Sequence, residues 1–323
     1  MLVLDEKELE TEKEHLKYVN GVIKETLSKM GGRVMKQQEK IKEFQDYRWS
    51  NTGHLDAQEL AVIRTSSEME ANILLREHRY FLNLYRIENN PYFGSIIFEE
   101  TNKKPQTIYI GMTHLRERDS LDNIIFDWRS PICSLFYDYE VGKCEYEAPI
   151  GIIKGNLNRK RQYNIKNGKL IRMFDNPLSI SDDILQEVLE KESSEKMENI
   201  VNTIQKEQNQ IIRGNEKRNL IIQGVAGSGK TSVALHRIAY LLYKIENLTS
   251  RNVLIFSPND VFTEYISNVL PEIGEENTLQ TTFSDYLKYQ ITEYNDVESF
   301  SDFIARYYTY SETSPELIRY KQS

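Results

Sequence analysis

A glycine-rich segment, residues 224–231, restricts the fold of this chain more than any other feature. Its sequence, GVAGSGKT, fits the pattern G-x-x-x-x-G-K-[ST], whose glycines let the backbone turn tightly and direct N–H groups at phosphate oxygens. The apolar residues 220–222 before it predict a buried strand, and residues 230–245 after it predict a helix. Strand, loop and helix together predict a site for ATP or GTP.

Two side chains at the end of this glycine loop are the candidate catalytic groups. Lys230 is predicted to reach the β and γ phosphates, and Thr231 to supply a hydroxyl to Mg²⁺. The predicted cofactors are therefore a nucleoside triphosphate, ATP or GTP, and Mg²⁺. The residues expected to contact the nucleotide here are Gly224, Val225, Ala226, Gly227, Ser228, Gly229, Lys230, Thr231 and Ser232.

Length and composition favour a soluble protein of more than one domain. The chain has 323 residues, of which 39% are hydrophobic and 28% charged. No apolar run approaches the ~18 residues of a membrane span, so we expect a cytoplasmic protein with no membrane partner. The two cysteines, Cys133 and Cys144, are interpreted as reduced thiols rather than a disulfide or a metal site.

Two long amphipathic helices are predicted at the N-terminus. From about residue 5 to 48, Leu9, Leu16, Ile23 and Met30 recur every seven residues. Residues 47–54 interrupt the pattern. A second stripe then continues to about residue 90, formed by Leu60, Ser67, Leu74 and Phe81, with Ile63 and Tyr85 beside it.

A short connection between two long helices favours an antiparallel hairpin. About 40 residues per helix gives a rod on the order of 60 Å, which is mostly surface and suits an arm that enters a partner. A packed helical bundle is the alternative. Gly31 and Gly32 predict a bend in the first helix.

Between residues 91 and 178 the residue pattern is typical of β-strands. Strands are predicted at residues 95–98, 107–110, 124–126, 134–137 and 150–153. Residues 141–143 predict a hairpin turn that would pair Cys144 near Tyr139, and Asn167–Gly168 predicts a second turn. The basic cluster of this region is Lys154, Arg159, Lys160, Arg161, Lys166, Lys169 and Arg172. A solvated strand face is its favoured interpretation, and a phosphate-binding surface the alternative.

The predicted fold class is multidomain α+β and α/β. Residues 1–90 form an antiparallel helical hairpin, or coiled coil; residues 91–178 a β-rich domain; and residues 179–213 a helical connector. Residues 214–293 then form part of a RecA-like parallel-sheet domain, with further strands at 253–256 and 279–282 and a helix at 261–270. Residues 294–323 begin an insertion or a truncated tail.

Residues flanking the glycine loop resemble superfamily 1 helicases of the UvrD/Rep type. The resemblance makes Gln208 the adenine reader, with Gln205 a weaker candidate, because a side-chain amide can both donate to and accept from a purine edge. It also implies that Arg237 contacts the nucleotide, a surface salt bridge being the alternative. Segments that resemble motifs Ia and Ib imply a nucleic-acid path along Ser257, Pro258, Asn259, Thr282 and Phe283, although such short polar segments are often ordinary loops.

The order of these parts along the whole chain resembles the HelD family. The features that carry this resemblance are the helical hairpin, the DWRSP sequence at residues 127–131, the glycine loop and residues 269–274. The resemblance implies a helicase-like ATPase whose hairpin enters the secondary channel of RNA polymerase and whose ATP-linked motion frees the polymerase from nucleic acid. Asp127, Trp128 and Arg129 are interpreted as structural, with Trp128 in a core and an Asp–Arg pair fixing a turn.

The chain differs from that family because it lacks a sequence segment that a hydrolysing motor needs. No acidic segment for Mg²⁺ and water follows Ser284, so we expect an N-terminal fragment that binds ATP without the full hydrolysis machinery. Three hypotheses stay open: a remodeller of RNA polymerase, a 3'-5' helicase fragment acting on single-stranded DNA, and a non-catalytic binding module.

Overall fold

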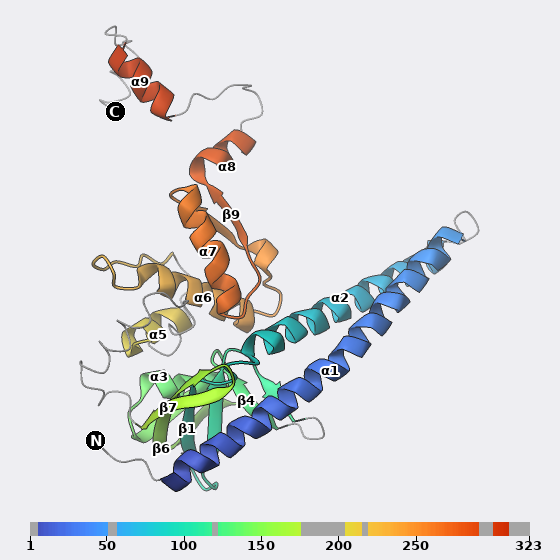
Figure 1. Cartoon of the computed structure of the whole chain (residues 1–323). Coiled ribbons are helices and arrows are strands. Elements are labelled where there is room, and N and C mark those ends of the chain that lie inside the picture. The colour runs from blue at the N-terminus through green and yellow to red at the C-terminus, as the bar shows by residue number, and fades with distance from the viewer. Residues whose placement is uncertain are drawn as a thin grey trace. The chain divides into compact units, whose positions relative to one another are not determined.

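The computed structural model describes residues 6–50, 57–117, 122–175, 204–214, 219–290 and 300–309. Figure 1 labels the helices and strands of the chain, which divides into two compact units. The first unit comprises residues 1–248 and 269–276, and the second comprises residues 249–268 and 277–323. Part of the predicted connector, residues 179–203, lies outside the described residues.

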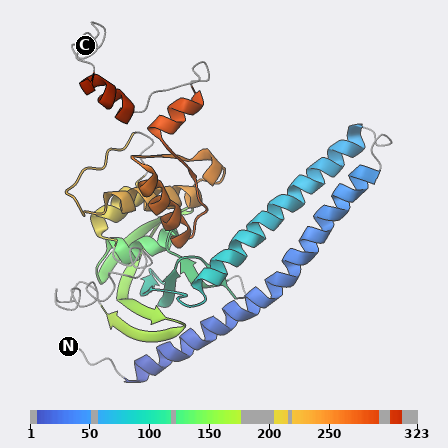
Figure 2. The same ribbon diagram turned by 45° about the horizontal axis from the view of Figure 1, so that its top comes forward.

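The N-terminal hairpin is present as predicted. Helix α1 spans Glu6–Ser50 and helix α2 spans Ala57–Ile87, and Figure 2 shows them side by side. Leu16, Ile23 and Met30 are all buried, which confirms the seven-residue stripe of the first helix. The helix continues without a break through Gly31 and Gly32, because a helical backbone accepts glycine at a modest cost in stability.

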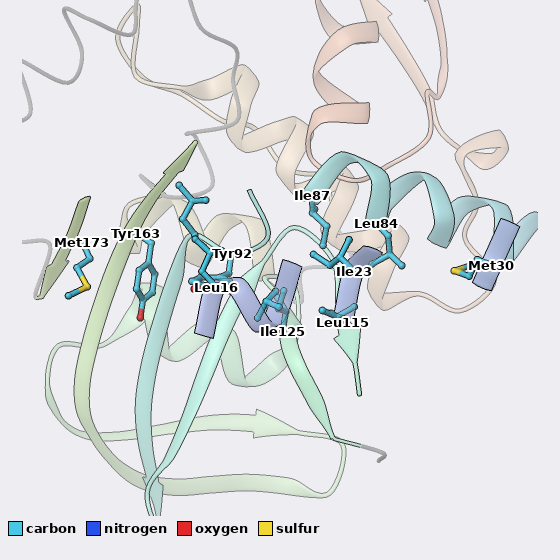
Figure 3. Packing of buried hydrophobic residues seen from close by; sticks show 12 residues of the cluster. Leu16, Ile23, Met30, Leu84, Ile87, Tyr92, Leu115, Ile125, Tyr163 and Met173 are labelled. Carbon is cyan, nitrogen blue, oxygen red and sulfur yellow. The ribbon is translucent and has the colours of Figure 1, made fainter. Parts of the chain in front are cut away.

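The buried face of α2 differs from the predicted stripe at the base of the hairpin. Leu84 and Ile87 are buried there, whereas Tyr85 is 64% exposed, so the assignment of Tyr85 to the stripe was wrong. The reason is that this end of α2 packs on the sheet as well as on α1. Leu84 and Ile87 share one hydrophobic cluster with Leu115 and residues of α1 (Figure 3).

A mixed sheet forms the centre of the first unit. Its order is β3-β4-β2-β1-β6-β5, with β7 paired to β6. The β2–β4 pair is parallel and the other pairs are antiparallel. The strands are β1 (Gly94–Glu100), β2 (Gln106–Gly111), β3 (Leu115–Arg116), β4 (Asn123–Asp127), β5 (Gly142–Ala148), β6 (Gly151–Lys166) and β7 (Lys169–Asp175). The turn at Asn167–Gly168 joins β6 to β7, as predicted.

Two local predictions in this region were wrong. Residues 134–137 form the helix α3 (Ser134–Asp138) after the short helix η1 (Pro131–Cys133), because a brief apolar run fits a buried helix as well as a strand. Residues 141–143 are no hairpin turn, since β5 begins at Gly142 and reverses after Ala148. Cys144 consequently lies opposite Gly155.

A polar network around the buried Glu12 binds the start of α1 to the sheet. Glu12 accepts hydrogen bonds from the hydroxyls of Tyr163 (2.9 Å) and Tyr109 (3.1 Å). Its carboxylate also lies 3.2 Å from the guanidinium of Arg161, which pairs in addition with Glu8 and Asp175. Burial, followed by the charge of Glu12, raises the pKa of both tyrosines, so both remain neutral donors.

This network changes the interpretation of the basic cluster. Arg161 is buried and Arg159 is half-buried against Glu8 and Glu12, so neither belongs to a solvated strand face. Lys160 is buried as well, and its ammonium donates to the carbonyl of Tyr139. The predicted solvated face was therefore wrong for these residues, because carboxylates of α1 cover Arg159 and Arg161, and Lys160 contacts the backbone at Tyr139.

The second unit contains a small parallel sheet. Strand β8 (Leu254–Ser257) pairs in parallel with β9 (Leu279–Thr282), which confirms both predicted strands and their direction. The helix η5 (Ser250–Asn252) precedes β8, and α8 (Phe283–Gln290) and α9 (Phe300–Thr309) follow β9. Helix α7 (Asp260–Glu272) begins in this unit and ends in the first. Within the described ranges, no helix combines the length and apolarity needed to cross a membrane.

Candidate nucleotide-binding site

The glycine loop lies directly before helix α6 (Lys230–Lys244) in the first unit. Gly227 and Gly229 adopt left-handed backbone conformations with φ of 80° and 76°, which side chains of other residues rarely accept. These two turns bring the chain into the first turn of α6, whose free N–H groups and positive dipole favour an anion.

The segment before the loop does not form the predicted strand. Residues 219–225 have no regular secondary structure, and the side chain of Ile221 is 89% exposed. A strand needs a neighbouring strand to satisfy its backbone groups, and among the described residues no strand pairs with this segment. The prediction of a buried strand at residues 220–222 was therefore wrong.

Lys230, Thr231 and Ser232 occupy the first turn of α6 and are half-buried. The ammonium of Lys230 donates to the carbonyl of Val225 at 2.6 Å, so it lies at the loop itself. Within the described part of the chain, no group of three or more His, Cys, Asp or Glu side chains could hold a metal ion. The assignment of the Thr231 hydroxyl to Mg²⁺ stays a prediction.

Gln208 lies beside the glycine loop. It belongs to helix α5 (Lys206–Arg213), and a methyl group built at Gly229 would lie 3.3 Å from Gln208 Nε2. Gln205 is the N-cap of this helix, and its backbone N–H donates to Gln208 Oε1 at 3.2 Å. The capping bond uses one lone pair of the Gln208 side-chain oxygen, and the amide nitrogen lies near the loop.

Arg237 contacts backbone carbonyls. Its guanidinium donates to the carbonyl oxygens of Ile211 and Gly214, which lie at the C-terminal end of α5. These bonds connect α6 to α5 within the first unit. The contact of Arg237 with a nucleotide stays a prediction.

The turn at residues 127–131, here the Trp128 turn, has the structural role predicted for it. Trp128 is fully buried, and the Arg129 guanidinium pairs with the Asp127 carboxylate at 2.6 Å. Arg129 also pairs with Glu275. Burial alone would lower the pKa of Arg129, but Asp127 and Glu275 outweigh burial and raise it, so this guanidinium stays charged.

Arg213 joins α5 to the Trp128 turn, and sequence reasoning missed it. Its guanidinium donates to the carbonyls of Trp128, Arg129 (3.1 Å) and Ser130 (3.2 Å). Asn209 accepts from Arg213 Nε at 3.0 Å and donates to Asp138 at 2.8 Å. The four-residue spacing of Asn209 and Arg213 places both on one face of α5, but the sequence does not reveal the carbonyls that this face meets.

His236 provides a second contact between α6 and the Trp128 turn. Its ring meets the Trp128 indole edge-on, with 5.6 Å between centroids, and its Nδ1 lies 2.7 Å from the carbonyl of Ser232. Burial lowers the pKa of His236, so the ring is neutral and donates from Nδ1 to that carbonyl. One side chain therefore connects the first turn of α6 to Trp128.

The predicted nucleic-acid path lies in the second unit, where most of its residues make local contacts. Ser257 is buried and bonds Thr263, and Asn259 accepts from the backbone N–H of Phe262 at 2.9 Å at the start of α7. Thr282 accepts from the N–H of Asp285 at 3.2 Å at the start of α8. Pro258 and Phe283 are exposed, and the Phe283 ring lies 6.4 Å from that of Phe256.

Comparison with known protein families gives two matches. The family described as "DNA helicase IV HelD, N-terminal domain" matches residues 9–210, more than half of the chain. The family described as "UvrD/REP helicase N-terminal domain" matches residues 204–268. Both matches include Gln208 and most of α5, and the second includes the glycine loop. A comparison with curated proteins finds no match.

Proposed function

Because the chain belongs to the HelD family of helicase-like proteins, we propose that it binds Mg·ATP at the glycine loop and RNA polymerase through its helical hairpin. The proposed binding of Mg·ATP is supported by the position of Gln208 beside Gly229. An amide that can donate and accept at the edge of a purine thus lies next to a backbone that favours phosphate. Base and phosphates would be bound from α5 and the loop together.

Each group has a distinct part in this proposal. Lys230 holds the β and γ phosphates with its ammonium, and the free amides at the start of α6 donate to phosphate oxygens. Thr231 presents its hydroxyl to Mg²⁺, which when bound neutralises part of the phosphate charge. The proposal is for binding of ATP.

Changing Gln208 tests the nucleotide half. We expect Gln208→Ala to reduce the preference for ATP over GTP by about 10-fold, since one or two hydrogen bonds to adenine would be lost. Competition of ATP and GTP for a fluorescent nucleotide analogue measures this ratio. Gln210→Ala is the matched control, because Gln210 is exposed on the same helix. An unchanged preference in Gln208→Ala would contradict the assigned role.

The proposed binding of RNA polymerase by the hairpin is supported by exposed apolar side chains along α2. Leu75 and Leu82 are separated by seven residues, lie on one face and are 58% and 38% exposed. We expect the double change Leu75→Glu, Leu82→Glu to abolish retention of the full chain on immobilised bacterial RNA polymerase. Ile152→Glu, at a position 64% exposed on β6, is expected to keep it.

A DNA helicase function is the second candidate, favoured by the UvrD/REP match to residues 204–268. The exposed ring of Phe283 could stack on a base in single-stranded DNA. Retention of the chain by single-stranded DNA that is lost in Phe283→Ala, with no retention by RNA polymerase, would support this function over the first.

A further inference from the structure

We propose that Glu275 is a positioning residue that couples the nucleotide site to the base of the hairpin. It does so through the Arg129 cluster, defined as Asp127, Arg129 and Glu275. This inference rests on the proposed binding of nucleotide at the glycine loop. Every contact in it lies within the first unit.

The first step runs from the loop to the Trp128 turn along α5. Gln208, near one end of this helix, lies at Gly229, and Arg213 at the other end donates to three successive carbonyls of the turn. An α-helix is stiff over this length, because its backbone bonds fix the rise per residue. A shift of Gln208 toward a bound base would therefore reach Trp128, Arg129 and Ser130.

Helix α6 gives a second connection to the same turn. The helix begins at Lys230 in the glycine loop, and Tyr243 near its other end lies over the Arg129 guanidinium at 4.9 Å from the ring centroid. The Tyr243 hydroxyl lies 3.2 Å from Ser130 Oγ, within hydrogen-bond distance. Both helices that flank the nucleotide site thus end on the residues around Arg129.

The step to the hairpin uses three consecutive residues, Gly274 to Glu276. Glu275 pairs with Arg129, whereas its two neighbours bond α2. Asn83 Nδ2 donates to the carbonyl of Gly274 at 3.5 Å, and the guanidinium of Arg79 lies 2.9 Å from the Glu276 carboxylate. Movement of Arg129 would be carried by Glu275 to this segment, and by the segment to the base of α2.

The central pair is largely shielded from solvent. The side chains of Arg129 and Glu275 are 5% and 12% exposed, so solvent screens their attraction little. Burial raises the pKa of Glu275, and Arg129 opposes that shift. The carboxylate thus depends on the position of Arg129 for its charge to be stabilised, as expected of a contact that responds to small shifts.

Hydrogen exchange of the full chain tests the coupling. With Mg²⁺ and a non-hydrolysable ATP analogue, we expect exchange in the α2 segment 79–87 of the wild type to change by at least about 5-fold, a typical size for coupled sites. In Glu275→Gln, which keeps the shape but removes the charge, this change should disappear. Glu246→Gln, at an exposed position after α6, should respond like the wild type.

A second variant guards against a folding defect in Glu275→Gln. Arg79→Ala removes the exposed pair with Glu276, leaves the Arg129–Glu275 pair in place, and should also reduce the response of segment 79–87. Calorimetry with the analogue is done on the same samples. Binding without any change at segment 79–87, or an undiminished response in both variants, would overturn the coupling. Absence of binding in the wild type would instead overturn the proposed function on which the coupling rests.

Discussion

Trp128→Ala is expected to lower the free energy of unfolding by about 3–5 kcal/mol, the usual cost of removing a fully buried large aromatic side chain. The indole fills the space between the Trp128 turn and His236, so its loss leaves a cavity where α6 meets the turn. Urea unfolding followed by circular dichroism measures the change.

The control for this prediction is Ile152→Ala, at an exposed position of β6. It should cost less than about 0.5 kcal/mol, as surface changes usually do. A loss below about 1 kcal/mol in Trp128→Ala would mean that the turn does not support α6 in the way described.

Glu12→Ala is expected to cost about 3–5 kcal/mol as well, for an electrostatic reason. The change would remove the acceptor of the half-buried Tyr109 hydroxyl, one of the two partners of the buried Tyr163 hydroxyl, and part of the pairing of the Arg161 guanidinium. Breaking a buried ion pair from one side is costly. Urea unfolding again measures the loss. We also expect proteolysis within residues 6–30 to become faster, because α1 would be held less firmly on the sheet.

The same helix offers a matched control for Glu12. Glu10 carries the same charge two residues away, but it is exposed and pairs with the exposed Lys13. Glu10→Ala should therefore change stability by less than about 0.5 kcal/mol. Equal losses in the two variants would show that burial of Glu12 contributes nothing.

The parts of the fold that the sequence predicted well have a local and repeated signal. Leu16, Ile23 and Met30 mark one helix face every seven residues, and Asn167–Gly168 marks a turn by the backbone freedom of its residues. The glycine loop was predictable for the same reason. Its glycines indicate tight turns, and Gly227 and Gly229 are indeed left-handed.

The errors arose where tertiary neighbours decide the structure. Residues 220–222 are apolar enough for a strand, but a strand forms only beside another one. Leu135 and Phe136 are buried on several sides, which a helix after Pro131 achieves as well as a strand. Tyr85 fitted the stripe expected for two helices packed on each other. Because α2 also packs on the sheet, Leu84 is buried and Tyr85 is exposed.

The contacts around Arg129 could not be predicted, because they join residues far apart in the chain. Glu275 lies 146 positions from Arg129, and Arg213 lies 85 positions from Trp128. Family resemblance pointed to residues 127–131 and 269–274 as separate marks. Only the fold brings the Trp128 turn together with Glu275 and α5.

Titration of the chain with Mg·ATP by calorimetry tests the central claim most directly. The account predicts binding at a single site in the wild type and an affinity lower by about 10- to 100-fold in Lys230→Ala, since charge-assisted hydrogen bonds to phosphate would be lost. It is contradicted if the wild type binds no Mg·ATP, or if Lys230→Ala binds it as tightly as the wild type.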